Sequence, residues 1–457
     1  MGRLVVVSNR VALPSESRAG GLALAVLGAL KETGGVWFGW SGKRVSGESG
    51  TVHEVSDGNI RYVTVDLSRA DHDAYYSGFS NATLWPLLHF RLDLVDYSRE
   101  TWAGYQRVNE LFAKLLMDEI APDDTVWIHD YHLIPLAKFL RERGAKCRIG
   151  FFLHVPMPSS DLLAALPEHA ELFAGLSCYD LVGFQTYRDL ERFQDYVRLY
   201  GGGKVISNGV LETAQGQRFR AGAFPISIDT AGIERQAAEA VNKPAVARLR
   251  RSLNQRQLAI GVDRLDYSKG LPDRFHAFER YLERHPEQRG SLTFLQIAPA
   301  SRSDVTEYQA LRSRLEGLTG HINGAHAEPD WTPVRYVNRN FPHPVLMGFY
   351  RIAHVALVTP LRDGMNLVAK EFLAAQDPQD PGVLVLSRFA GAAMELGGEA
   401  LLVNPYDVDG VADAIAAAAA MPLGERRERW DAMMRTLRRF DITYWRKSYL
   451  KALMREG

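Results

Sequence analysis

The stretch TVWIHDYHL, residues 125–133, is the best guide to the fold of this 457-residue chain. Its first half is a short run of β-branched and aromatic residues, and its second half, from His129 on, is mostly polar. A continuous apolar run of this length is typical of a strand buried on both faces of a parallel sheet. The polar residues then follow the carboxyl end of the strand, where open α/β sheets bind their ligands.

The same pattern recurs along the chain. Further strand-like runs are Leu4–Ser8, Ile149–His154, Leu181–Phe184, Leu258–Val262, Leu292–Ala298, Val355–Thr359, Val383–Ser387 and Leu401–Asn404. Segments with helical periodicity lie between them: Trp102–Met117, Leu133–Arg143, Arg188–Tyr200, Asp273–Arg284, Val305–Gly317 and Leu367–Gln376. This alternation predicts the doubly wound α/β class, with parallel sheets covered by helices on both faces.

The length of the chain predicts more than one domain, because single cores rarely grow this large. The best boundary lies near Pro225–Thr230, where a polar helical stretch, Ile233–Arg251, precedes a fresh strand. The final segment, Tyr444–Met454, is predicted to be an amphipathic helix with no strand after it.

Composition excludes several classes of protein. Lys plus Arg and Asp plus Glu both number 54, so the basic excess of a nucleic-acid-binding protein is missing. The N-terminal apolar run is too short for a signal peptide, and no segment approaches the roughly 20 apolar residues that span a bilayer. Cys147 and Cys178 are interpreted as reduced thiols, so we expect a cytoplasmic protein without nucleic-acid or membrane partners.

Three glycine-containing loops follow strands and are suited to phosphate. The first joins Ser8-Asn9-Arg10 to Ala19-Gly20-Gly21-Leu22, and is equally well explained as a plain loop before a helix. The second places Arg264 and Lys269 after a strand, where they could hold a diphosphate or pair with neighbouring aspartates. The third runs from Pro360 to Glu371, and the first amides of its helix can receive phosphate. Its order of strand, Asp-Gly loop, helix and acid favours ribose binding by Glu371 over a solvated first-turn acid.

Polar residues also end two other strands. Asp130 stands at a typical catalytic position. Structural roles are favoured for His129 and His132, because HxxH without a carboxylate partner is weak evidence for zinc. A structural role is also favoured for His154, because a lone histidine at a strand end is more often structural than functional. Gly201–Lys204 lacks the spacing and the hydroxyl residue of a phosphate loop, and is interpreted as a turn. Asp407-Val408-Asp409 precedes a helix, so capping is favoured over metal binding. No metal site or cofactor is predicted.

Taken together, the motifs resemble the trehalose-6-phosphate synthase family, which consists of retaining nucleotide-sugar glucosyltransferases. The matching pieces are SNR, AGGL, VWFGWSG, FSNATLWPLLH, WIHDYHL, IGFFLHVPMP, DRLDYSKGLP, QIAPASR, TPLRDGMNLVAKE and SRFAGAA, in family order from residue 8 to about 392. The resemblance implies a GT-B fold, in which two Rossmann-like domains face each other across the active site. It gives an acceptor-side domain, 1–225, completed by the C-terminal helix 440–457, and a donor-side domain, 226–439.

The resemblance also implies the reaction and the residues that perform it. Glucose would pass from UDP-glucose to glucose 6-phosphate with retention and without metal, by front-face attack, forming α,α-trehalose 6-phosphate. The donor would be held by Gly21, Leu22, Arg264, Lys269, Phe341, Asp363, Asn366, Leu367, Val368 and Glu371. The acceptor would be held by Arg10, Trp40, Tyr76, Trp85, Asp130 and Arg302. The catalytic set would be Asp130, His154, Arg264, Lys269 and Asp363.

Several alternatives stay open on the sequence. The donor base could be uracil, guanine or adenine, and the acceptor could be that of a glucosylglycerol-phosphate synthase or a pseudo-sugar coupling enzyme. A silent regulatory subunit or a nucleotide-binding module would have lost some of the named cations or acids, and none is lost. By resemblance we expect a homo-oligomer, dimer or tetramer, that serves osmoprotection or the supply of trehalose.

Overall fold

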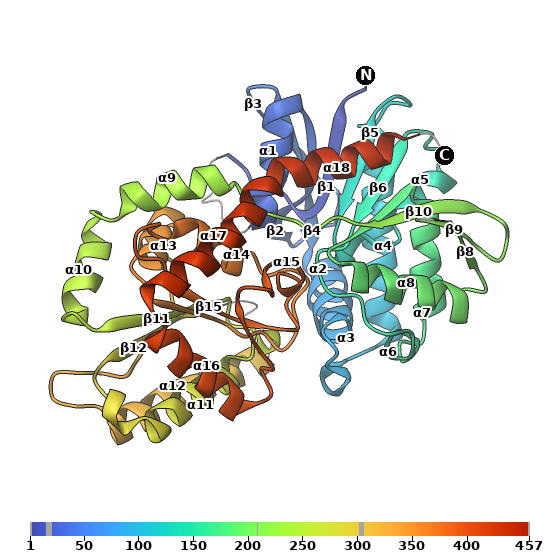
Figure 1. Ribbon diagram of the computed structural model, residues 1–457. Helices are drawn as coiled ribbons and strands as arrows, with labels where there is room; N and C mark the ends of the chain where they lie inside the picture. The colour runs from blue at the N-terminus through green and yellow to red at the C-terminus, as the bar shows by residue number, and fades with distance from the viewer. Residues whose placement is uncertain (1, 15–20, 208, 301–305, 456–457) are drawn as a thin grey trace. The chain divides into compact units, whose positions relative to one another are not determined.

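The computed structural model describes residues 2–14, 21–207, 209–300 and 306–455. The chain divides into two compact units. The first comprises Met1–Pro225 and Trp445–Gly457, and the second comprises Ile226–Tyr444. The chain therefore passes from the first unit to the second at residue 225 and returns at residue 444 (Figure 1).

A ten-stranded sheet forms the centre of the first unit, in the order β3-β4-β2-β1-β5-β6-β7-β10-β9-β8. The strands from β4 to β10 in this order run parallel, and β3, β9 and β8 pair antiparallel at the two edges. Their bounds are β1 Leu4–Arg10, β2 Gly35–Val45, β3 Val52–Asp57, β4 Ile60–Ser68, β5 Thr125–His129, β6 Arg148–Phe152, β7 Leu181–Phe184, β8 Lys204–Ser207, β9 Val210–Glu212 and β10 Arg218–Ala223.

The parallel strands agree with the predicted class, whereas the antiparallel strands at these edges were not predicted. Strand β3 is exposed along its whole length, so it lacks the apolar run that identifies a buried strand. Strand β2 contains the motif VWFGWSG. It was not predicted as a strand, because its glycines and polar end interrupt the β-branched pattern.

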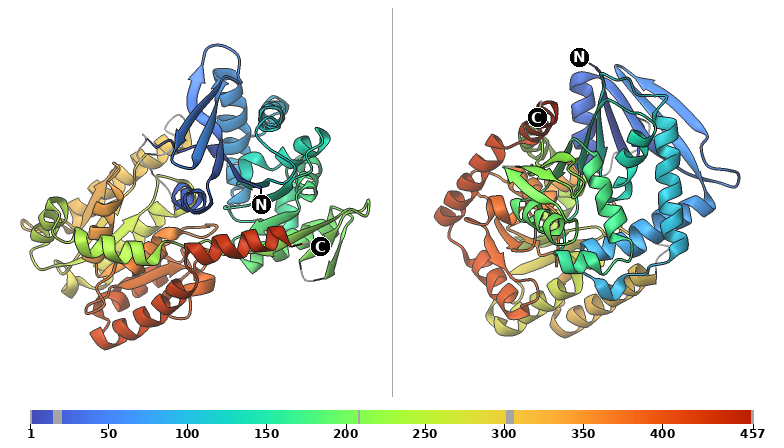
Figure 2. Two further views of the ribbon diagram at one scale, coloured as in Figure 1. Left: turned by 90° about the horizontal axis from the view of Figure 1, so that it is seen from above. Right: turned by 90° about the vertical axis from the view of Figure 1, so that its right-hand side faces the viewer.

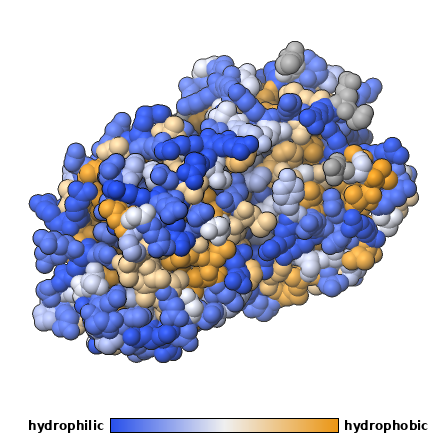
Figure 3. Space-filling view, in the orientation of Figure 1, coloured by the Kyte–Doolittle hydropathy of each residue, from blue (hydrophilic) through white to orange (hydrophobic). Residues whose placement is uncertain are grey.

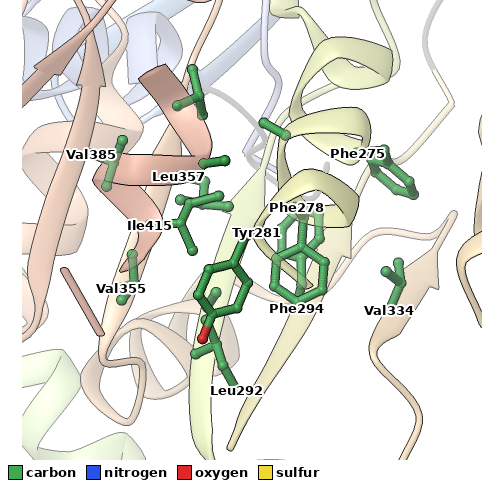
Figure 4. Close-up of a cluster of buried hydrophobic side chains, with 14 of the residues drawn as sticks. Phe275, Phe278, Tyr281, Leu292, Phe294, Val334, Val355, Leu357, Val385 and Ile415 are labelled. Atoms are coloured by element: carbon green, nitrogen blue, oxygen red, sulfur yellow. The ribbon is translucent and has the colours of Figure 1, made fainter. Parts of the chain in front are cut away.

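The second unit contains a six-stranded parallel sheet in the order β13-β12-β11-β14-β15-β16. The strands are β11 Gln257–Val262, β12 Leu292–Ile297, β13 Val334–Val337, β14 Val355–Val358, β15 Val383–Ser387 and β16 Leu401–Val403. Figure 4 shows how Phe278 and Tyr281, from the helix after β11, pack over Phe294 and Leu292 of β12. Burial of such large apolar side chains is the main source of stability of the fold.

Helices cover both sheets (Figures 1 and 2). Those of the first unit are α1 Gly21–Thr33, α2 Arg69–His72, α3 Trp85–Leu88, α4 Arg99–Leu116, α5 Leu136–Glu142, α6 Ser160–Ala164, α7 His169–Ala174 and α8 Tyr187–Leu199. The others are α9 Thr230–Ala240, α10 Pro244–Leu253, α11 Leu271–Arg284, α12 Thr306–His326, α13 His343–Arg351, α14 Leu367–Ala375, α15 Ala393–Leu396, α16 Val408–Ala420, α17 Leu423–Arg439 and α18 Ile442–Met454.

Two predicted helical stretches differ from the structure by more than a few residues. The stretch Ile233–Arg251 is divided into α9 and α10, because Pro244 occupies the first turn of α10 and cannot continue a preceding helix. Helix α12 continues nine residues beyond the predicted end at Gly317, and the predicted first residue, Val305, lies outside the described residues.

A π-helix, η1, spans Asp73–Leu84 and is the least common element of the first unit. The N–H group of Trp85 at its end donates to the carbonyl of Ser80, five residues earlier, as the π geometry requires. Such helices are rare and are often found at functional sites.

The last helix, α18, packs on the first unit. The Tyr449 ring stacks on Trp127 of β5 with ring centroids 4.8 Å apart, and its hydroxyl donates to the carbonyl of Phe151 at 2.8 Å. Arg446 pairs with Glu32 of α1 at 2.9 Å. The first unit is thus built from both ends of the chain.

The face drawn in Figure 3 is mostly hydrophilic, with hydrophobic residues gathered in small patches. Within the described parts of the chain, each helix is too short or too polar to cross a membrane.

Candidate active site

Polar residues follow three neighbouring parallel strands of the first unit. Asp130 follows β5, His154 comes two residues after β6, and Gln185 follows β7. The backbone N–H of His154 donates to Oδ1 of Asp130 at 3.2 Å, and Nε2 of Gln185 lies 3.4 Å from Nδ1 of His154. Gln185 was missed in the sequence, although its position directly after a predicted strand was the available signal.

Asp130 has an unusual backbone conformation, with φ 76° and ψ 166°. This region is essentially restricted to glycine and is strained for any other residue. The peptide is held in place on both sides, because its N–H donates to the carbonyl of Phe152 at 2.8 Å and its carbonyl accepts from Leu133 at 3.0 Å. Strained backbone conformations are concentrated at functional sites, which supports Asp130 as a candidate functional residue.

His154 is also held by His129, whose Nδ1 lies 3.0 Å from Nε2 of His154. Burial lowers the pKa of His154 to about 3. Burial, together with the nearby His154, holds the pKa of His129 well below its ordinary value. Both rings are therefore neutral near pH 7.

The predicted acceptor aromatics belong to one continuous wall of rings. Trp40 of β2 lies 5.7 Å from Tyr76 of η1, and Tyr76 stacks on His132 at 5.8 Å with an interplanar angle of 10°. His132 contacts Tyr131 at 3.9 Å, and Tyr131 lies 5.7 Å from Trp85 of α3. The structure thus joins Trp40, Tyr76 and Trp85 through the two residues that follow Asp130.

Arg10 stands beside this wall at the end of β1, opposite Trp40 in the strand register. Its guanidinium covers Gly42, where a Cβ atom would come within 3.0 Å of the Arg10 Nε and Cζ atoms. Since Gly42 also has a φ of 86°, a side chain there would be strained as well as crowded. An exposed cation beside stacked aromatic rings is suited to a sugar that carries a negative charge.

Some predicted residues receive only a partial description. Gly21 and Leu22 form the start of α1, where backbone amides suit an anion. Arg302 lies outside the described residues.

In the second unit, three predicted donor residues meet directly. Nζ of Lys269 lies 2.5 Å from Oδ2 of Asp363, and both side chains are largely buried. Nδ2 of Asn366 donates to the same oxygen at 3.0 Å. These residues follow the carboxyl ends of β11 and β14, as the sequence pattern predicts for a ligand site.

The alternative, in which Arg264 and Lys269 only pair with neighbouring aspartates, is wrong for Lys269. Asp263 instead pairs with the buried Arg274 at 2.7 Å, and Asp266 accepts from the N–H of Ser268 at 2.9 Å. Arg264 is exposed after β11.

Arg274 was missed in the sequence, because nothing local distinguishes it from a solvated helix residue. Its guanidinium donates to Asp263, to Gln296 at 2.9 Å and to Thr359 at 2.9 Å. These acceptors lie at or within one residue of the carboxyl ends of β11, β12 and β14, so one side chain connects three strand ends. The same guanidinium also donates to the carbonyl of Lys269 at 3.4 Å. Burial raises the pKa of Asp263, and Arg274 opposes this effect.

Helix α14 begins beside Asp363. Asn366 precedes it in a left-handed conformation, with φ 72°, and makes no side-chain cap to the helix. The first N–H groups of a helix have no partner within it, so the amides near Leu367 and Val368 form a suitable anion site. The loop after β15 holds the Asp363 backbone on both sides. The N–H of Gly391 donates to the carbonyl of Asp363 at 3.2 Å, and the N–H of Asp363 donates to the carbonyl of Phe389 at 3.2 Å.

Glu371 and Phe341 have their own surroundings. Oε1 of Glu371 lies 3.8 Å from Nε2 of His343. The Phe341 ring packs against Phe349, with centroids 5.2 Å apart, and beneath the guanidinium of Arg339 at 4.8 Å.

The two rejected motifs behave as ordinary structure. Asp407 accepts from the N–H of Gly410 at 3.0 Å and caps α16, which confirms the capping interpretation. Gly201–Gly203 connect α8 to β8, and Lys204 pairs with Glu212 at 2.9 Å. In the described ranges, His, Cys, Asp and Glu side chains form no group of three or more that could hold a metal ion.

The chain matches Glycosyltransferase family 20 over residues 5–455. A relative from Sinorhizobium fredii, named trehalose-6-phosphate synthase, is 52% identical over 99% of this chain and 98% of its own length. A relative of the same name from Enterobacter sp. is 51% identical over 100% of this chain and 96% of its own length.

Solved structures extend the likeness to three dimensions. An α,α-trehalose-phosphate synthase (UDP-forming) from Burkholderia xenovorans, in complex with glucose-6-phosphate, has a TM-score of 0.96 at 49% identity, over 99% of this chain and 100% of that chain. A structure from E. coli, bound with UDP-2-fluoro glucose, has a TM-score of 0.96 at 48% identity, over 100% of both chains. This agreement confirms the predicted fold class, GT-B. Because the family match covers nearly the whole chain and its relatives are about half identical to it, the chain belongs to glycosyltransferase family 20.

Proposed function

We propose that the protein transfers glucose from UDP-glucose to glucose 6-phosphate with retention, forming α,α-trehalose 6-phosphate and UDP. The observation that carries this proposal is the meeting of Lys269, Asp363 and Asn366 at the start of α14. A cation and helix amides suit a diphosphate, and a carboxylate beside them suits the hydroxyls of the attached sugar. The names and bound ligands of the relatives support the same donor and acceptor.

On the donor side, we propose that Arg264, Lys269 and the amides of Gly21, Leu22, Asn366, Leu367 and Val368 hold the diphosphate. Asp363 would bind the glucose hydroxyls, Glu371 the ribose, and Phe341 would lie near the base. As the bond to glucose breaks, negative charge grows on the departing UDP, and fixed cations and helix amides stabilise that charge without metal.

On the acceptor side, we propose that Arg10, Tyr76 and Arg302 grip the phosphate and that Asp130 contacts the sugar between Trp40 and Trp85. His154 would lie near the donor glucose, where a neutral imidazole donates or accepts a hydrogen bond without adding charge. Retention would follow from front-face attack, with the leaving phosphate accepting the proton of the acceptor. The 1,1 linkage would then result from the orientation of the acceptor.

We further propose a cytoplasmic homo-oligomer that uses UDP-glucose in preference to GDP- or ADP-glucose. The composition supports the location, and the family resemblance supports the assembly and the donor.

The test is nucleoside diphosphate release from UDP-, GDP- and ADP-glucose, with and without glucose 6-phosphate, followed by mass analysis of the product. Acceptor-dependent release together with a non-reducing disaccharide monophosphate is the expected result. Release that requires another acceptor would replace the acceptor assignment, and a folded protein inactive with every donor would contradict the proposed enzyme activity.

A further inference from the structure

Lys370 is a fully buried lysine in the helix that begins at the candidate donor site. Its ammonium contacts Oε2 of Glu395 at 2.5 Å and donates to the carbonyl of Ile226 at 2.8 Å. A buried ammonium loses its hydration, and replacing such an ion pair by apolar residues often leaves stability unchanged or improved. Stability alone therefore gives little reason for a charge at this position.

The first partner of Lys370, Glu395, links the ammonium to the loop that carries Asp363. Glu395 belongs to α15, which follows the loop that supports Asp363 through Phe389 and Gly391. The N–H of Ala392, directly before α15, donates to the carbonyl of Met365, directly before Asn366. These contacts connect α14 to α15 through the Asp363 loop and the loop after β15. The Lys370–Glu395 pair then connects α15 directly back to α14.

The second partner lies where the chain enters the second unit. Ile226 is the first residue of that unit, and it begins a buried segment in which Ile228 accepts from the N–H of Ile442 at 3.0 Å. One ammonium therefore connects α14 to the segment through which the chain arrives from the first unit.

We propose that Lys370 is a positioning residue for the nucleotide-sugar diphosphate. Through Glu395 and Ile226, it fixes the start of α14 and the loop of Asp363 in the arrangement that binds the donor. This inference rests on the proposed function, because it assigns the donor to this helix end. Small displacements of positioning groups reduce binding and turnover strongly, so the effect should be large although the Lys370 side chain is fully buried.

The test compares three variants with the wild-type protein. Lys370→Met removes the charge but keeps an unbranched side chain, and Lys370→Met/Glu395→Met removes the whole pair. The matched control, Gln376→Met, removes buried hydrogen bonds to Tyr350 and Gly382 at the other end of α14. The readouts are the Kd of UDP by titration calorimetry, the KM values of UDP-glucose and glucose 6-phosphate, and the Tm.

For Lys370→Met, we expect the Kd of UDP and the KM of UDP-glucose to rise by about tenfold or more, while the KM of glucose 6-phosphate stays within about twofold. In the double variant, the Tm should recover, because no carboxylate is left unpaired, but UDP should still bind weakly. The control should lose Tm and keep its donor affinity.

One result in the double variant and one in the control would overturn the positioning role. One is recovery of UDP affinity together with the Tm in the double variant, and the other is an equal loss of UDP affinity in the Gln376→Met control. Wild-type protein that binds no uridine nucleotide would instead contradict the proposed function. Wild-type binding with unchanged affinity in Lys370→Met would contradict the positioning role alone.

Discussion

Replacing Asp130 by glycine should make the protein more stable than replacing it by alanine. The native conformation, φ 76° and ψ 166°, is one that glycine adopts readily and alanine does not. Backbone strain of this kind costs about 1–3 kcal/mol. Alanine retains the strain, whereas glycine relieves it.

The comparison isolates the backbone, because both variants lose the same carboxylate and the same 3.2 Å hydrogen bond from the N–H of His154. Glycine also makes the unfolded chain more flexible, which offsets the gain by about 0.5–1 kcal/mol. With the middle of each range, Asp130→Gly should exceed Asp130→Ala in free energy of unfolding by roughly 1 kcal/mol.

The assay is urea unfolding followed by circular dichroism, with the same pair of substitutions at Asp123 as a control. Asp123 is exposed and has an ordinary negative φ, so glycine should be the less stable variant there. Both Asp130 variants should lose turnover, since each lacks the proposed acceptor contact. An Asp130→Ala protein as stable as Asp130→Gly would refute the reasoning from strain.

Four further predictions concern charge and protonation. Lys269→Met should lower kcat by about 10²–10³-fold, whereas the control Lys204→Met, at an exposed position, should leave kcat unchanged. Steady-state kinetics measures both values, and a loss of kcat below about tenfold in Lys269→Met would argue against a role in leaving-group stabilisation. Arg10→Ala should raise the KM of glucose 6-phosphate far more than that of UDP-glucose, and equal losses would remove Arg10 from the acceptor site. Histidines in the unfolded chain have a pKa of about 6.5, so below this pH the unfolded state binds protons that the buried His154 and His129 do not. The free energy of unfolding should therefore fall as the pH drops from about 6.5 towards 3, by up to about 1.4 kcal/mol per pH unit for each histidine. Urea titrations should show a shallower slope in His129→Gln, and an unchanged slope would be inconsistent with the neutral buried pair. Turnover should survive EDTA, because cations and helix amides take the role of a metal, and a loss that magnesium reverses would contradict this.

Much of the fold was predictable because buried parallel strands have a strong local signal. The strands that end at His129, Phe184 and Ser387 were located to the residue from their apolar runs. The exposed edge strand β3 was not, since its side chains face water and its backbone pairing depends on β4. The π-helix η1 was also invisible, because its hydrogen bonds skip five residues and produce no familiar period.

The candidate site was predictable only where a motif carried it. Lys269, Asp363 and Asn366 stood in recognisable loops, and the structure brings them together. Gln185, Arg274 and Lys370 act through partners that are distant in the sequence, so no window around them reveals their contacts. The wall of aromatic rings was likewise not predictable, because it depends on how η1 turns Tyr76 towards His132.

The position of α18 has a consequence for synthesis on the ribosome. The residues of the first unit up to 225 emerge early, but Tyr449, which stacks on Trp127, is made about 220 residues later. At roughly 5–20 residues per second, the nascent first unit waits about 10–45 s for the helix that covers Trp127. The first unit should therefore need protection by chaperones until late in translation, and a message cut short after residue 444 should leave the first unit incomplete although the second is whole.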